Sequence, residues 1–115
     1  MTVYPEAKQF ADEFKKKFGK NPEPFAAQAY DATAIAIKAM EATTKGGKAP
    51  TRDGVTAAVR DVRHKGVTGS VEFDSKGDPK KALYFVLQVA NEDPAKWGDN
   101  KEVKRLTIAA PVPKK

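Results

Sequence analysis

The acidic residues of the stretch Asp74-Ser-Lys-Gly-Asp78 come closer to the spacing of a cation-binding loop than any others in this sequence. A calcium loop places carboxylate or amide oxygens at alternating positions and closes with a glutamate. Here Lys76 occupies one of the alternating positions, and no glutamate follows at the closing distance. Asp, Gly and Pro each favour a bend, so the stretch is predicted to be the turn of a hairpin.

The other reactive side chains do not combine into a catalytic or metal site. The stretch 66–70, Gly-Val-Thr-Gly-Ser, precedes a predicted strand, whereas a phosphate-binding loop opens a helix and carries a lysine. His64 is the only histidine and the sequence has no cysteine, which leaves no histidine pair for a metal and no thiol nucleophile. Glu72 and Asp74 lack the surroundings of an acid–base pair. We therefore expect no enzymatic activity, no metal and no cofactor.

Length and composition are those of one soluble globular domain. The chain has 115 residues, of which 40% are hydrophobic and 31% charged. Its first residues lack the basic region and apolar core of a signal peptide, so none is expected in this chain. The longest apolar stretch, within residues 25–40, is interrupted by polar residues, and no membrane span is expected.

The positive charge, +6 overall, is divided among short groups of basic residues. These groups occur at residues 15–17, 80–81, 104–105 and 114–115. Lysines near helix ends, turns and termini are usually solvated or complement a helix dipole. A nucleic-acid partner is therefore not expected. A free-standing basic module that binds nucleic acid or another acidic partner remains the alternative interpretation.

The spacing of apolar residues predicts three helices, over residues 5–18, 24–43 and 51–64. In the first helix Phe10, Phe14 and Phe18 recur every four residues and form a predicted core face. The second helix can begin at Pro24 and is apolar on more than one side, so it needs neighbours on several sides. Thr51 is a plausible N-cap for the third helix.

Two strands, residues 69–73 and 82–90, are predicted to pair as a hairpin. In the second strand both faces are apolar, since Leu83 and Phe85 alternate with Tyr84 and Val86. Such a strand normally lies in a sheet that is covered on both sides, and an exposed edge invites pairing with another chain. We therefore expect the isolated chain to form a homodimer through residues 83–89.

The remaining residues, 91–115, are predicted to be a polar tail with at most a short strand at 106–110, because Pro111 and Pro113 follow it. The predicted fold class is thus α+β, with three helices and one β-hairpin. Residues 1–90 would form the folded segment.

Two stretches are the most specific pieces of a resemblance that covers the chain from about Pro5 to Val89. They are Phe25-Ala-Ala-Gln-Ala-Tyr-Asp-Ala32 and Gly69-Ser-Val-Glu-Phe-Asp-Ser-Lys-Gly-Asp78. In order and spacing the chain resembles the C-terminal part of the branched-chain amino-acid (Leu/Ile/Val-type) periplasmic solute-binding proteins of ABC importers. The resemblance implies a partial doubly wound α/β fold of the type I periplasmic-binding-protein kind. It also implies that the chain is a fragment that lacks most of the ligand site.

The same resemblance implies a function and a few site residues. The parent protein would capture an amino acid outside the cytoplasm, in the periplasm or extracellular space, and deliver it to an ABC permease in the membrane. Phe25, Ala27 and Gln28 would line the cleft near the side chain of the ligand, or else pack the helix start. Tyr30 and Asp31 match the motif as structural residues, the first in the core and the second as a hydrogen-bonding group.

Overall fold

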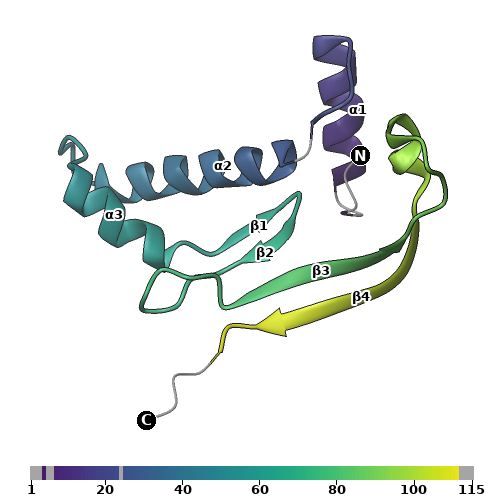
Figure 1. The fold of residues 1–115 in the computed structure, drawn as a ribbon. Helices are drawn as coiled ribbons and strands as arrows, with labels where there is room; N and C mark the ends of the chain where they lie inside the picture. Colours follow the sequence, from purple (N-terminus) through teal and green to yellow (C-terminus); the bar gives the residue numbers. More distant parts are fainter. Residues whose placement is uncertain (1–3, 5–6, 24, 112–115) are drawn as a thin grey trace.

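The computed structural model describes residues 4, 7–23 and 25–111. These residues form a mixed α+β structure with three α-helices and two small antiparallel sheets, which confirms the predicted fold class (Figure 1). The elements in chain order are α1 (Ala7–Phe18), α2 (Ala26–Thr43), α3 (Arg52–Asp61), β1 (His64–Gly66), β2 (Gly69–Val71), β3 (Lys81–Gln88), the 3-10 helix η1 (Pro94–Asp99) and β4 (Lys101–Ala109).

Local signals account for most helix ends. α1 stops at Gly19, whose φ of 73° is left-handed and whose amide donates to the Lys15 carbonyl at 2.9 Å. The Thr51 hydroxyl accepts a hydrogen bond from the Gly54 amide at 3.1 Å and caps α3. Before α2, Phe25 has the left-handed φ of 68°, and the Pro24 expected to open this helix lies outside the described residues.

α3 is shorter than the helix expected at residues 51–64. It ends at Asp61 because Val62 is already extended, with φ −66° and ψ 128°. His64 then begins strand β1 instead of closing the helix. The three residues of β1 pair with β2 around a two-residue turn, with His64 opposite Val71 and Gly66 opposite Gly69.

The predicted hairpin between residues 69–73 and 82–90 is wrong, because among the described residues these two segments do not pair with each other. An isolated bridge joins Phe73 and Pro79, and the Lys80 amide donates to the Glu72 carbonyl at 2.8 Å. Past this point the two segments take other partners, since β2 pairs with β1 and β3 pairs with β4 (Figure 1). β1 and β2 are joined by a two-residue turn, the shortest common hairpin connection, and β3 finds a partner of its own length in β4.

The tail is more ordered than expected. Residues 101–109 form a nine-residue strand, β4, in place of a short strand at 106–110. β4 pairs with β3 along its length, from Lys81 opposite Ala109 to Gln88 opposite Lys101, with one irregularity at Val86/Leu87. The charged residues of β4 fit this position because a two-stranded ribbon leaves room for exposed side chains.

Few side chains are fully covered. On α2 a stripe at spacing four, Ala27, Asp31, Ile35 and Ala39, is buried, and on α1 so is Ala7. The phenylalanine stripe predicted as a core face is only partly covered, with Phe18 56% exposed. No large side chain among the described residues is completely buried.

The molecule is thin and extended. Its principal extents are 53, 46 and 18 Å, and the Cα radius of gyration is 17.3 Å. A compact chain of this length has a radius of gyration of about 13 Å. α2 and α3 run on one side of the β1–β2 hairpin and the β3–β4 ribbon runs on the other, while α1 stands across the start of α2 (Figure 1). No helix among the described residues is long and apolar enough to cross a membrane.

Candidate functional site

The buried polar centre of the molecule is Asp31, on the inner face of α2. Its side chain accepts hydrogen bonds from the turn between β1 and β2 and is 2% exposed. The donors are the amides of Val67 at 3.0 Å and Thr68 at 2.8 Å and the Thr68 hydroxyl at 2.6 Å. One carboxylate therefore fixes the turn on the helix, as the hydrogen-bonding role implied for Asp31 requires.

Gly66 allows this close approach. A Cβ atom built at Gly66 would overlap the carboxylate of Asp31. The position therefore needs glycine because the backbone passes against a buried side chain, and not because of an unusual backbone angle.

His64 joins the same network from β1. Its Nε2 lies 3.2 Å from Asp31 Oδ1, and its Nδ1 lies 3.0 Å from the ammonium of Lys38 on α2. An ammonium can only donate, so Nδ1 accepts and the ring proton sits on Nε2, from which it is donated to Asp31. The single histidine is therefore a neutral structural residue in this arrangement, 8% exposed.

Burial and hydrogen bonding act on the pKa of Asp31 in opposite directions. Burial would raise the pKa, but hydrogen bonds from the Thr68 hydroxyl, the Thr68 and Val67 amides and the His64 ring stabilise the carboxylate. The net effect places the pKa of Asp31 below its usual value of 3.8.

Stability is therefore expected to fall in acid through Asp31. Because its folded pKa is lowered, the unfolded chain binds more protons in this range, and the stabilisation present above about pH 4 is lost as the pH falls through the folded pKa. The free energy of unfolding, measured with urea between about pH 2 and 6, should fall more steeply with decreasing pH in the wild type than in Asp31→Asn. Asp74→Asn serves as a comparison and not as a control, because the exposed Asp74 also has a lowered pKa and its replacement should flatten the pH dependence as well. Equal pH slopes for the wild type and Asp31→Asn would contradict the assignment.

The stretch 74–78 is a bend, as predicted. Asp74 Oδ1 accepts the amides of Lys76 at 2.8 Å and Asp78 at 3.0 Å, and the Asp74 amide donates to the Asp78 carbonyl at 2.8 Å. The hydrogen bond from the Asp78 amide is the main cause that lowers the pKa of Asp74. The Asp74 carboxylate thus accepts hydrogen bonds from backbone amides within the same turn. Among the described residues no group of three or more His, Cys, Asp or Glu could hold a metal ion.

The three residues expected to face a ligand have different surroundings at the start of α2. Phe25 is 76% exposed, Ala27 is buried, and Gln28 is partly buried. Gln28 Nε2 donates to the Tyr4 hydroxyl at 3.2 Å, and the Tyr4 ring meets Phe85 of β3 edge to face at 5.3 Å. The structure thus gives Gln28 a packing partner, and the ligand role of the three residues stays a prediction.

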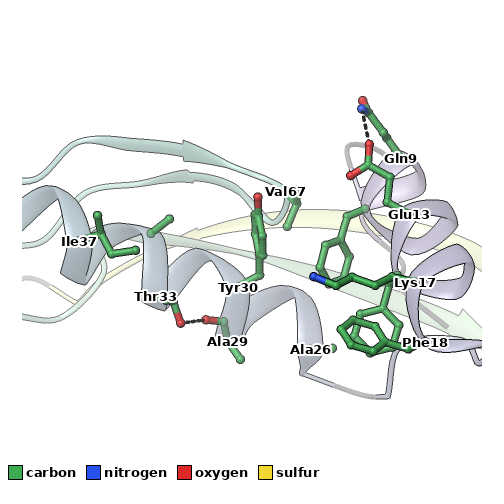
Figure 2. A pocket seen from close by; sticks show the side chains of 13 residues that line it. Gln9, Glu13, Lys17, Phe18, Ala26, Ala29, Tyr30, Thr33, Ile37 and Val67 are labelled. Carbon is green, nitrogen blue, oxygen red and sulfur yellow. Dashed lines mark hydrogen bonds between the residues drawn. The ribbon is translucent and has the colours of Figure 1, made fainter.

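A separate apolar groove of about 830 Å³ lies between α1 and α2 (Figure 2). From α1 it receives the phenylalanine stripe, and from α2 it receives Tyr30, whose ring lies 5.2 Å from that of Phe10. Tyr30 was expected in the core, but it is 56% exposed and forms one wall of this groove. The ring is only half covered because one side of α2 has no further layer over it.

Sequence reasoning did not find the partners of Asp31. The sequence places Val67 and Thr68 before a predicted strand and His64 at the end of the predicted helix 51–64, and it does not predict that they meet Asp31. The available signal was the pair of glycines, Gly66 and Gly69, which flank two residues and mark a tight turn. A buried aspartate in an otherwise apolar helix needs several donors, and such a turn supplies them.

Comparison with known proteins identifies the family of this chain. A family model described as periplasmic binding protein matches residues 2–94. The chain belongs to this family, which gives it a solute-binding role connected with transport and a periplasmic setting. Proteins of this family typically are not enzymes. No curated protein and no solved structure matches the chain. Residues 95–115, with β4, lie outside the matched segment.

Proposed function

We propose that this chain is part of an extracytoplasmic solute-binding protein that captures a branched-chain or related amino acid and delivers it to an ABC permease. The observation that carries the proposal is the family match over residues 2–94. The choice of an amino acid as the solute, and of an ABC importer as the partner, is supported by the resemblance of residues 25–32 and 69–78 to the Leu/Ile/Val-type proteins. The chain would correspond to the C-terminal part of such a protein.

The hydrogen bonds of Asp31 agree with this proposal. Asp31 belongs to the first of the two motifs, and the turn that it holds leads directly into the second, which begins at Gly69. The two motifs are therefore neighbours in space, connected by a buried carboxylate.

In this proposal the start of α2 faces the side chain of the bound amino acid. Phe25 offers an exposed aromatic ring and Gln28 an amide, while Ala27 is buried. Residues 25–28 carry no charged side chain that could pair with the carboxylate or the ammonium group of an amino acid. We therefore expect the chain by itself to bind amino acids weakly, with dissociation constants of about 1 mM or more.

Amide chemical shifts provide a direct test because they detect weak binding. Titration with leucine, isoleucine and valine should move the amide signals of residues 25–28 more than those of the β1–β2 turn. Gln28→Ala should reduce the shifts, whereas Gln9→Ala, at an exposed position of α1, should leave them unchanged. Shifts confined to other regions, or identical titrations for Gln28→Ala and the wild type, would contradict the proposed site.

The expected self-association through residues 83–89 stays a prediction. The Ala110 amide donates to the Lys80 carbonyl at 2.8 Å, so these two residues form a hydrogen-bonded pair. Because such pairs alternate along an antiparallel ladder, Ala82 and Tyr84 also face β4 with their backbone groups. The backbone groups of Leu83 and Phe85, which precede the irregularity, consequently point away from β4. The alternative function, a basic module that binds an acidic partner, receives no support from the comparisons.

A further inference from the structure

Tyr4 joins three elements of the structure. Its carbonyl accepts a hydrogen bond from the Ala7 amide, at the start of α1, at 3.0 Å, and its ring meets Phe85 of β3 edge to face at 5.3 Å. Its hydroxyl accepts a hydrogen bond from Nε2 of Gln28, on α2, at 3.2 Å. The backbone, the ring and the hydroxyl of Tyr4 are thus each held by a different element, and together these contacts fix where the hydroxyl lies.

The Phe85 ring that supports Tyr4 is itself held from β4. Arg105 lies opposite Phe85 in the ladder, and its guanidinium carbon is 5.0 Å from the centre of the Phe85 ring. The same guanidinium donates two hydrogen bonds to the Glu102 carboxylate, at 3.1 and 3.0 Å, which limit its rotation. Because β4 lies outside the matched segment, the support of Tyr4 comes from a part of the chain beyond the family match.

The hydrogen bond to Tyr4 determines which end of the Gln28 amide is left without a partner. Because Nε2 donates to the Tyr4 hydroxyl, the carbonyl oxygen Oε1 is turned away from it. No donor among the described residues bonds to this oxygen, and in that part of the chain no buried side-chain nitrogen or oxygen lacks a partner. The oxygen is therefore open to solvent, and it is an acceptor available to a bound molecule.

We propose that Tyr4 is a positioning residue that presents the carbonyl oxygen of Gln28 to the solute, and that the solute is a small amino acid with a hydrogen-bond donor on its side chain. This inference rests on the proposed function, in which the start of α2 faces the side chain of the bound amino acid. The hydroxyl of threonine would donate its proton to the oxygen. A methyl group at the same place, as in valine, would leave the oxygen without a donor.

The positioning role can be measured without any solute. Tyr4→Phe keeps the ring that meets Phe85 and removes only the hydroxyl. The side-chain amide signals of Gln28 in proton–nitrogen spectra should therefore shift, and its amide hydrogens should exchange faster with water. The matched control is Tyr84→Phe, which removes the same group from a ring on β3 that is 53% exposed and should leave the Gln28 signals unchanged. Unchanged Gln28 signals in Tyr4→Phe overturn the positioning role.

Titrations of the full 115-residue chain with matched solutes test the donor and need no variant. Followed through the amide signals of residues 25–28, threonine should bind about three- to tenfold more tightly than valine, which has the same shape without the hydroxyl. O-methylthreonine keeps the oxygen but lacks the proton, so it should bind no better than isoleucine. In Tyr4→Phe the ratio of the threonine and valine affinities should fall towards one, while the affinity for valine stays the same.

The outcomes separate this inference from the function on which it rests. Equal binding of threonine and valine, or a preference for O-methylthreonine over isoleucine, overturns the inference and leaves the proposed function standing. Absence of binding by all four amino acids overturns both. A preference for threonine that is unchanged in Tyr4→Phe overturns the role of Tyr4.

Discussion

Asp31→Ala is expected to destabilise the chain by about 3–4 kcal/mol, the largest effect of any single substitution that we predict. The substitution removes the acceptor for two backbone amides, one hydroxyl and the His64 ring. The amides of Val67 and Thr68 would be left in a partly buried position without this partner, and the His64 ring would lose the acceptor of its Nε2 proton. Urea denaturation monitored by far-UV circular dichroism measures this loss.

Two further variants show whether the network is responsible. Asp31→Asn keeps the shape and one carbonyl acceptor, so it should cost less than Asp31→Ala. Asp53→Ala removes an exposed aspartate from the first turn of α3. It should lower the free energy of unfolding by about 0.5 kcal/mol, the usual size of an interaction with the helix dipole. If Asp31→Ala were no more destabilising than Asp53→Ala, the buried network would not hold the turn on α2.

Gly66→Ala is expected to cost about 2–4 kcal/mol, although it adds only one methyl group. The added carbon would overlap the Asp31 carboxylate, so either the β1–β2 turn must move away or Asp31 must change rotamer. Both movements stretch the hydrogen bonds to Val67 and Thr68. Thermal unfolding followed at two wavelengths would give the shift in Tm.

Gly19→Ala separates the steric effect from the general cost of replacing a glycine. Gly19 has a left-handed φ of 73°, and nothing lies within 4 Å of an added Cβ. Its replacement should therefore cost about 1 kcal/mol, the usual penalty for a left-handed backbone. In the double variant Asp31→Ala, Gly66→Ala the two losses should not add, because the first substitution removes the group that the second one meets. Additive losses would show that Gly66 is required for another reason.

The helices could be predicted well because their signals are local. The spacing of the phenylalanines in α1 and the capping hydroxyl of Thr51 each depend on residues within one or two turns. The bend at 74–78 was predictable for the same reason, since Asp74 bonds to amides two and four residues away. Each of these structures forms without help from distant parts of the chain.

Strand pairing could not be predicted because it depends on competition between distant segments. Residues 82–90 are apolar on both faces, which indicates a strand and does not say which neighbour it takes. The four charged residues of β4 favour the prediction of a polar tail, yet on an open ribbon such residues keep their charges in water. Likewise, the charge of Asp31 gave no indication that its partners lie more than thirty residues away, at Val67 and Thr68.

The thinness of the fold has a consequence for its heat capacity. Unfolding raises the heat capacity in proportion to the apolar surface that it exposes, typically by about 12–15 cal/mol/K per residue. A chain only 18 Å across has already exposed much of that surface, so one copy alone should unfold with a smaller increment and a flatter stability curve. Association in pairs would restore part of the missing increment, and the curvature of stability with temperature would then depend on protein concentration.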